Sequence, residues 1–320
     1  MSKIAVTGGA GLIGSYLVDQ LVDAGEQVVV VDDFSKGKKE NLSHVIGRCE
    51  VVEGDLEDEG FAEKALSGLD TVYHLASRAY GIGYSVANHL DMLEHNERIT
   101  NNVLRAVRKN QIGKLLVTSS SCVHRDDTSD TVAELPLFDG EPEMVNWGYG
   151  WAKRFLEQKA LMYARETGVK LTIVRPFNIY GERYNWVGSK SQAIPMLVKR
   201  VLDGNDPVVI WGSGNQRRNY LHARDCATLM RHFLEVGYTS GPVNIGLRET
   251  ITMNGLVEAI CRAAGVSPAL EHDLTKPEGR FVKSSDETLL RSLLPDFEPS
   301  VSIQEGMALM VGWYRKTFIE

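Results

Sequence analysis

A tyrosine and a lysine four residues apart, Tyr149 and Lys153 in the stretch "YGWAK", are the side chains with the plainest chemical potential. On a helix this spacing places both on one face. A phenol ordinarily has a pKa of about 10, and a neighbouring ammonium group favours its ionised form. Tyr149 is therefore a candidate base for a hydroxyl proton. Such a pair taken alone is more often part of a solvated helix face, so the interpretation depends on its surroundings.

A second reactive stretch is "TSSSCVH" at residues 118–124, which follows the apolar run "KLLV". Three hydroxyl groups at a strand end form either an ordinary loop or a site that binds the oxygen of a reacting group. Cys122 comes next, and it is either a buried small thiol or a base. The residues alone leave both alternatives open.

A glycine-rich turn gives these residues a context, because "TGGAGLIG" starts at residue 7, directly after one strand pattern and before a helix pattern. Glycines at this point let the backbone approach a pyrophosphate at the helix N-terminus, where free N–H groups favour anions. We therefore predict a dinucleotide site, in which Tyr149 accepts a proton as hydride leaves and Lys153 holds the nicotinamide ribose. The residues predicted to bind the cofactor are Gly8, Gly11, Leu12, Ile13, Gly14, Asp32, Asp33, Asp55, Leu56, Leu75, Ala76, Ser77, Tyr149 and Lys153.

Two adjacent carboxylates, Asp32 and Asp33, end the next strand pattern about 20 residues beyond the glycines. A carboxylate there suits the hydroxyl groups of an adenosine ribose and repels a 2′-phosphate. The sequence therefore favours NAD over NADP. Asp55, in "GDL" after the third strand, is either an adenine contact or the N-cap of a helix.

The elements that must position these residues alternate along the first half of the chain. Strand patterns occur at 3–8, 27–33, 49–56, 71–76 and 114–120, with helix patterns between them. This alternation predicts an α/β fold with a doubly wound parallel Rossmann sheet and a smaller C-terminal substrate lobe. We assign residues 1–177 and about 217–247 to the NAD-binding domain, and about 178–216 and 248–320 to the lobe.

Composition narrows the function classes. A formal net charge of −7 over 320 residues argues against a nucleic-acid binder that relies on bulk charge. No apolar run approaches the roughly 20 residues of a membrane helix, and no leader pattern is visible, so we expect a cytoplasmic protein. The four cysteines show no paired spacing, so we expect reduced thiols and no metal site.

The sequence resembles the extended short-chain dehydrogenases/reductases of the NAD-dependent nucleotide-sugar epimerase/dehydratase family over nearly its whole length. The resemblance is carried by "TGGAGLIG", "HLAS", "TSSSCV", "YGWAK", "RPFNIYG" and "WGSGNQRRNYLH". It implies that Ser120, Tyr149 and Lys153 are catalytic. Sugar 4,6-dehydratases have Asp-Glu where this chain has Ser121 and Cys122, which counts against dehydration.

A cysteine at position 122 and the loop "YGIGYSVANH" are most similar to the GDP-mannose 3,5-epimerases, and the cysteine also to GDP-fucose synthases. In that resemblance Cys122 is a fourth catalytic residue, a carbon-acid base beside a 4-keto group. Those enzymes pair it with Lys or His, whereas spacing places Gln192 here, and an amide is no acid. Lys190 is a possible substitute. We interpret His124 as a residue of the pocket wall.

The same resemblance implies a clamp for the diphosphate of a sugar nucleotide. Guanidinium groups suit such bidentate contacts, and Arg218 is favoured over Arg217. Arg280 or Lys283 would complete the clamp, and a GDP-sugar is the favoured substrate. The residues predicted to bind substrate are Gly81, Ser121, Asn178, Gln192, Arg218 and Arg280.

The leading hypothesis is an NAD-dependent nucleotide-sugar epimerase that works through a transient 4-keto sugar, inverting C4 or, as in the GDP-mannose 3,5-epimerases, C3 and C5. The alternatives are a ketosugar reductase or dehydrogenase, a 4,6-dehydratase, or a non-catalytic NAD-binding protein. The resemblance also implies a homodimer, because the helices predicted at about 86–109 and 149–167 resemble the pair that forms a four-helix interface in this family, and "LEQKALMYA" is apolar on more than one face.

Overall fold

A seven-stranded parallel sheet forms the centre of the protein in a computed structural model, which describes residues 2–186, 188, 191–276 and 280–320. The strand order is β12-β7-β5-β4-β1-β2-β3, and every neighbouring pair is parallel. The order reverses between β1 and β4, the point at which open sheets bind ligands beyond their carboxyl edge. The strands are β1 (Lys3–Thr7), β2 (Gln27–Asp32), β3 (Glu50–Glu53), β4 (Thr71–His74), β5 (Lys114–Thr118), β7 (Lys170–Pro176) and β12 (Pro242–Ile245).

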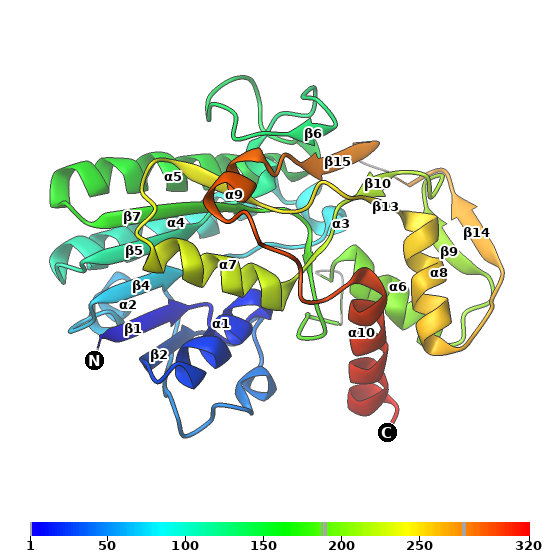
Figure 1. The fold of residues 1–320 in the computed structure, drawn as a ribbon, viewed down its shortest axis with the longest axis horizontal. Helices are drawn as coiled ribbons and strands as arrows, with labels where there is room; N and C mark the ends of the chain where they lie inside the picture. The colour runs from blue at the N-terminus through cyan, green and yellow to red at the C-terminus, as the bar shows by residue number, and fades with distance from the viewer. Residues whose placement is uncertain (1, 187, 189–190, 277–279) are drawn as a thin grey trace.

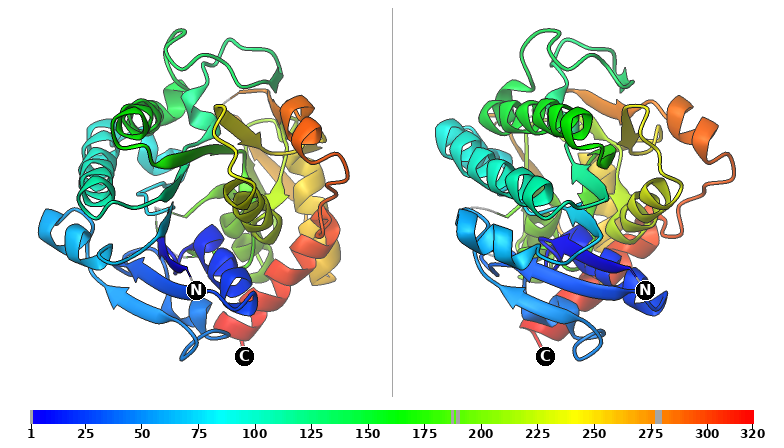
Figure 2. Two further views of the ribbon diagram at one scale, coloured as in Figure 1. Left: turned by 60° about the vertical axis from the view of Figure 1, so that its left-hand side comes forward. Right: turned by 90° about the vertical axis from the view of Figure 1, so that its left-hand side faces the viewer.

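Helices cover both faces of this sheet (Figures 1 and 2). One face packs against α1 (Leu12–Asp23) and α7 (Ala223–Glu235), and the other against α2 (Glu59–Ala65), α4 (His89–Lys109) and α5 (Trp147–Thr167). Strands buried on both faces need apolar side chains at successive positions, which explains the run of valines in β2. The predicted α/β fold and its parallel sheet are confirmed.

A smaller lobe lies beyond the carboxyl edge of the sheet, on the right of Figure 1. Its core joins three helices and strand β9 in one apolar cluster, and β14 pairs with β9. The elements are α6 (Ala193–Leu202), α8 (Met253–Ala264), α10 (Ile303–Phe318), β9 (Val208–Trp211) and β14 (Leu270–Asp273).

A second small sheet links the two halves of the chain, in the order β13-β10-β15-β6. Its strand β6 comes from the segment between Ser120 and Tyr149, although its neighbour β15 lies far along the chain. Helix α9 (Thr288–Leu293) and Phe297 return to the core of the large sheet. The residue ranges that we assign to the two domains stay a prediction. The strands are β13 (Ile251–Thr252), β10 (Arg217–Arg218), β15 (Val282–Ser285) and β6 (Thr131–Val132).

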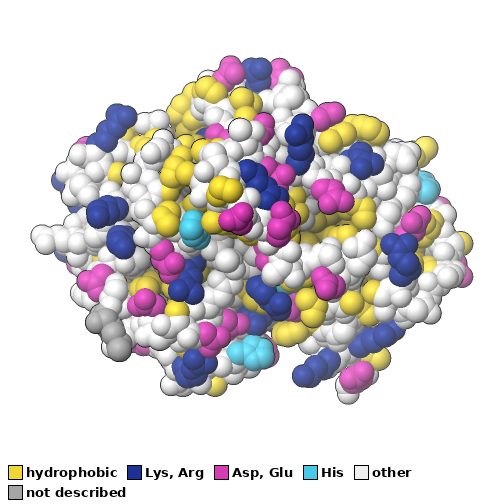
Figure 3. Space-filling view, viewed as in Figure 1, with side chains coloured by type: hydrophobic (Ala, Val, Ile, Leu, Met, Phe, Trp, Pro, Cys, Tyr) yellow, Lys and Arg dark blue, Asp and Glu magenta, His cyan; other side chains and the backbone are white. Residues whose placement is uncertain are grey.

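The surface shown in Figure 3 carries basic and acidic side chains interspersed, without a field of one sign. Within the described part of the chain, no helix is long and apolar enough to cross a membrane. The described residues also contain no cluster of three or more side chains suited to hold a metal ion. All four cysteines carry free thiols.

Candidate active site

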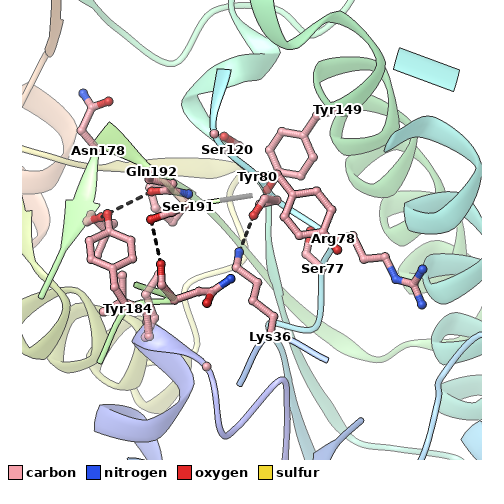
Figure 4. Close-up of a pocket in the computed structure, with 18 of the residues that line it drawn as sticks. Lys36, Ser77, Arg78, Tyr80, Ser120, Tyr149, Asn178, Tyr184, Ser191 and Gln192 are labelled. Carbon is pink, nitrogen blue, oxygen red and sulfur yellow. Dashed lines mark hydrogen bonds between the residues drawn. The ribbon is translucent and has the colours of Figure 1, made fainter. Parts of the chain in front are cut away.

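A cavity of about 700 Å³ runs from the glycine turn to the smaller lobe. The strand ends of the parallel sheet supply one side of it, and residues around α6 and β10 supply the other. Figure 4 shows side chains from these distant segments pointing into the same space. Every residue predicted to bind cofactor or substrate, or to act in catalysis, lines this cavity except Arg280.

The glycine turn forms a cradle that side chains would fill. Gly8 has φ +68°, and a Cβ there would lie 2.8 Å from backbone atoms of Ala76. A Cβ at Gly14 would lie 2.2 Å from the carbonyl oxygen of Gly8, inside any tolerable contact. Helix α1 begins at Leu12, so its free N–H groups point to the space that the glycines leave open. The turn therefore fits the pyrophosphate of a dinucleotide.

The buried carboxylate of Asp32 fixes this turn to the end of β2. One oxygen accepts a hydrogen bond from the N–H of Ala10 (2.9 Å), and the other accepts one from the N–H of Phe34 (2.9 Å). Burial raises the pKa of Asp32, and the two backbone bonds oppose that effect. A carboxylate has about four acceptor positions, so it retains capacity for ribose hydroxyl groups. Asp33 also lines the cavity and accepts hydrogen bonds from Ser35.

We predict that NAD binds much more tightly than NADP and that Asp32→Ala weakens this discrimination. A 2′-phosphate would place a second negative charge against a buried carboxylate. Calorimetric titration of both dinucleotides into the two proteins measures the effect, and Asp70→Ala, at the opposite end of the sheet, is a control of the same chemistry. Equal affinity of the unchanged protein for NAD and NADP would refute the prediction.

Asp55 lies on the cavity wall and is not a helix cap. Its carboxylate accepts a hydrogen bond from the N–H of Glu57 (2.8 Å) and lies 3.4 Å from Arg78. The cap of α2 is Asp58, which accepts a hydrogen bond from the N–H of Phe61. The capping alternative for Asp55 was therefore wrong, and its adenine contact stays a prediction.

The three predicted catalytic residues come together where β5 meets α5. Ser120 caps the short helix at Ser121–Val123, and its oxygen accepts a hydrogen bond from the N–H of Cys122 (3.1 Å). The ammonium group of Lys153 donates to the carbonyl of Thr118 (2.8 Å) and lies 5.5 Å from the centre of the Tyr149 ring. The α5 helix thus presents both side chains to the end of β5, as the spacing predicts.

Two glycines beside Tyr149 allow this approach, a signal that sequence reasoning missed. A Cβ at Gly150 would lie 2.7 Å from the carbonyl oxygen of Cys122. A Cβ at Gly148 would lie 1.9 Å from the carbonyl oxygen of His89. The pattern "WGYGWAK" therefore lets α5 begin in backbone contact with both the Cys122 segment and α4.

Burial controls the ionisation of the pair. It raises the pKa of Tyr149, the proximity of Cys122 raises it further, and hydrogen bonds with Ser77 and Ser120 lower it. Lys153 does not produce the lowering of the Tyr149 pKa that the sequence led us to expect. Burial also lowers the pKa of Lys153 to about 7, with the charge of Lys36 the next cause.

Lys36 is a further residue that the sequence interpretation missed. It lies in the loop after Asp33, and its ammonium group donates to the carbonyl of Ala79 across the cavity (Figure 4). Its ammonium group lies 5.7 Å from the centre of the Tyr80 ring. Burial lowers the pKa of Lys36 to about 8, against the raising effect of Asp32. A cation at this point suits the phosphates of a dinucleotide.

The thiol of Cys122 lines the cavity beside a buried ion pair, Glu143 and Lys283, whose charged atoms are 3.1 Å apart. Burial raises the pKa of Cys122 to about 12, Glu143 raises it further, and Lys283 and Ser120 lower it. Burial favours the protonated form of this thiol as it does that of the Tyr149 phenol, and the adjacent carboxylate of Glu143 is what weighs against a role of Cys122 as a base. No local pattern joins Glu143 and Lys283, so the sequence offered no signal for the pair.

The predicted substrate residues occupy the far end of the cavity. Arg218 lines it, whereas Arg217 bonds to Thr250 outside it. Asn178, at φ +41°, donates to Asn219 (2.8 Å). Gln192 stands at the N-terminus of α6 without capping it through its side chain, and its amide oxygen accepts a hydrogen bond from the hydroxyl of Tyr184 (2.9 Å).

Of the remaining predicted residues, some line this end of the cavity and others lie outside it. Gly81 fits tightly, because a Cβ there would lie 2.3 Å from the carbonyl oxygen of Ser191. Arg280 does not line the cavity, since its guanidinium donates to Thr128 and to neighbouring carbonyls. Lys283 does line it. Lys190, the proposed substitute for an acid, lies outside the described residues.

His124 is not part of the cavity wall, contrary to the sequence interpretation. It is buried behind the wall, with its ring 5.9 Å from that of Phe177. Burial lowers its pKa to about 3, and the charge of Arg175 is the next cause. The side chain is therefore a neutral packing residue.

Comparisons with known proteins agree with this site. UDP-glucuronic acid decarboxylase 1 of Arabidopsis thaliana is 30% identical over 99% of this chain and 71% of its own length. GDP-mannose 3,5-epimerase 1 of Oryza sativa subsp. japonica is 26% identical over 98% of this chain and 82% of its own. The crystal structure of UDP-glucose 4-epimerase from Thermotoga maritima with UDP-glucose superposes with a TM-score of 0.84 at 28% identity, covering 98% of this chain and 99% of that one.

One protein family accounts for the glycine cradle, for the carboxylate of Asp32 that suits a ribose, and for the pair of Tyr149 and Lys153. Residues 4–246 match the model of the NAD dependent epimerase/dehydratase family, a span that includes the glycine turn and all the predicted catalytic residues. NAD is the cofactor of the family, and it supplies a hydride acceptor when bound. The chain belongs to the NAD dependent epimerase/dehydratase family.

Proposed function

We propose that the protein is a nucleotide-sugar epimerase that inverts C4 through a transient 4-keto sugar. The observation that carries the proposal is the meeting of Ser120, Tyr149 and Lys153 in one cavity with a substrate end lined by Arg218. Tyr149 accepts the proton of the 4-hydroxyl group as the C4 hydride leaves. Tyr149 returns that proton when hydride is delivered to the other face of the ketone, so the cofactor is regenerated. Ser120 donates a hydrogen bond to the carbonyl oxygen.

The state of Cys122 favours inversion at C4 over inversion at C3 or C5. Removal of a proton from a ring carbon needs a thiolate, and the carboxylate of Glu143 beside the thiol opposes its formation. The second group that such a reaction needs is absent at Gln192, whose amide is bound to Tyr184. These contacts support a role for Cys122 as a small side chain beneath the sugar.

The substrate class is a nucleoside diphosphate sugar. Arg218 and the backbone of the glycine-containing loop that precedes it suit a diphosphate. The relatives named above act on UDP- and GDP-sugars by their names, and the Thermotoga structure holds UDP-glucose. The preference for GDP stays a prediction, and titration with UDP-, GDP-, dTDP- and CDP-sugars distinguishes the bases.

The proposed reaction is tested by incubating the NAD-loaded protein with sugar nucleotides in deuterium oxide. We expect an inverted C4 centre, no net NADH, and no deuterium at C3 or C5, in both the unchanged protein and Cys122→Ser. Proton NMR of the product measures all three. Net formation of NADH would indicate a dehydrogenase. Deuterium at C3 or C5 that Cys122→Ser abolishes would restore the base role and a 3,5-epimerase.

We propose that the protein is a homodimer through α4 and α5, which lie side by side in Figure 2. Ion pairing between Lys159 and Glu97 joins the two helices, and Met162 is 51% exposed on α5. Light scattering at micromolar concentration is expected to give twice the mass of 35.5 kDa. Met162→Lys is expected to weaken the dimer, and a single species at the monomer mass in the unchanged protein would refute it.

A further inference from the structure

The ion pair beside Cys122 is built into the wall of the cavity. The side chains of Lys283 and Glu143 are only 7% and 8% exposed, and both line the cavity. The second oxygen of Glu143 accepts a hydrogen bond from Asn146 (2.9 Å), and its N–H donates to the carbonyl of Cys122 (3.2 Å). The carboxylate is thus fixed against the Cys122 segment from three directions.

Each member of the pair comes from a different half of the chain. Glu143 immediately precedes the turn that leads into α5, and Lys283 lies on β15, across from Arg218 on β10. Burial raises the pKa of Glu143, but the charge of Lys283, followed by hydrogen bonds from Asn146, Cys122 and Lys283, lowers it to about 2 and holds the carboxyl ionised. The pair therefore presents a net charge of zero to the cavity, with hydrogen-bond donors and acceptors on both sides.

We propose that Glu143 and Lys283 determine which sugar the cavity accepts, favouring a neutral sugar over a sugar acid. The proposal rests on the proposed function, because it assigns the sugar of that nucleotide-sugar substrate. A sugar carboxylate beside Cys122 would meet the carboxylate of Glu143, while Lys283 is already paired. Hydroxyl groups of a neutral sugar, in contrast, can accept from Lys283 and donate to Glu143.

The two other buried lysines of the cavity do not replace Lys283 in this role. Lys153 bonds to the carbonyl of Thr118, and Lys36 to that of Ala79, both on the side of the cofactor. Arg218 also lines the cavity, across from Lys283, but it is assigned to the diphosphate, so the cation offered to a sugar carboxylate beside Cys122 is one already paired with Glu143. Removal of the Glu143 charge leaves Lys283 unpaired and turns the same wall into a site for an anion.

The experiment measures binding without turnover, in the NAD-loaded Tyr149→Phe protein. Calorimetry compares ligands that differ only at C6, UDP-glucose with UDP-glucuronate and GDP-mannose with GDP-mannuronate. Of the two ligands in whichever set binds, we expect the neutral sugar nucleotide to bind roughly tenfold or more tightly than the acidic one, the effect of one neighbouring charge. Adding Glu143→Gln is expected to reduce or reverse that ratio, and adding Glu141→Gln, an acid outside the cavity, to leave it unchanged.

Glu143→Gln leaves one buried charge unpaired, which destabilises a fold. A second variant therefore separates a change in ligand selection from a loss of stability. Glu143→Gln with Lys283→Met removes both charges, and we expect the ratio to fall toward one. Equal binding of the two ligands by the Tyr149→Phe protein, or a ratio unchanged by both variants, overturns the proposed selection alone. A protein that binds none of the four sugar nucleotides contradicts the proposed function as well.

A second readout does not depend on any sugar. Mass spectrometry follows the alkylation of Cys122 by iodoacetamide at one fixed, mildly alkaline pH. Glu143→Gln is expected to accelerate it by about tenfold or more, since it removes the negative neighbour of the thiol. Lys283→Met is expected to slow it. Identical rates in all three proteins would show that the pair does not act on the cavity beside Cys122.

Discussion

Replacement of Tyr149 by phenylalanine is expected to lower kcat by about 10²–10⁴-fold, the usual loss when a general acid–base group is removed. The hydroxyl lies with Ser77 and Ser120, and Tyr149 is not part of the glycine turn that fits the phosphates. NAD affinity is therefore expected to change little. Steady-state kinetics with whichever sugar nucleotide the titration selects, and calorimetry with NAD, measure the two effects.

Tyr163→Phe is the matched control for this experiment, because Tyr163 lies on the same helix but does not line the cavity. We expect the control to keep its activity. A Tyr149→Phe protein with near-normal kcat would exclude the proposed role of the phenol. Loss of NAD binding in that protein would show instead that the hydroxyl group supports the cofactor.

The change Arg175→Met is expected to lower the free energy of unfolding by about 3–5 kcal/mol, because it leaves a buried carboxylate without its partner. Arg175 makes a bidentate contact with Glu157, at 2.8 and 2.9 Å, and both side chains are almost completely buried. The same carboxylate accepts a hydrogen bond from Ser119. The contact thus joins α5 and β7 directly beside Ser120.

Urea denaturation of the NAD-free protein measures this loss. Arg231→Met removes an exposed pair one helical turn apart and is expected to change the free energy of unfolding by about 0.5 kcal/mol or less. An effect of Arg175→Met as small as that of the control would contradict the prediction. The double change Arg175→Met and Glu157→Leu is expected to recover most of the loss, since no charge then remains unpaired.

Local patterns were sufficient for the parts of the site that one strand, turn or helix creates. The glycine turn requires small residues at fixed positions, and the four-residue spacing of Tyr149 and Lys153 is itself helical geometry. Asp32 follows from its place at the end of a strand. The parallel sheet follows from the alternation of strands and helices, which the spacing of apolar side chains along the sequence reveals.

Contacts between distant segments could not be predicted in the same way. Glu143 and Lys283 are 140 positions apart, and neither lies in a recognisable motif. Arg280 and Lys283 were both candidates for the clamp, and charge alone does not reveal that Arg280, just before β15, bonds to Thr128 while Lys283 on the strand lines the cavity. His124 was placed in the wall for a related reason, since a residue after a strand end can turn toward either side.

Because β6 pairs with β15, we expect the two halves of the chain to fold together rather than separately. Residues 131–132 depend on a strand that is synthesised some 150 positions later, and the large sheet is completed only when β12 arrives from the second half of the chain. A fragment that ends at residue 177 would lack both partners, together with α7 and α9, which cover the sheet. We therefore expect the nucleotide cradle to depend on the second half of the chain, and the segment that carries Cys122 to acquire its final position only when β15 has formed beside β6.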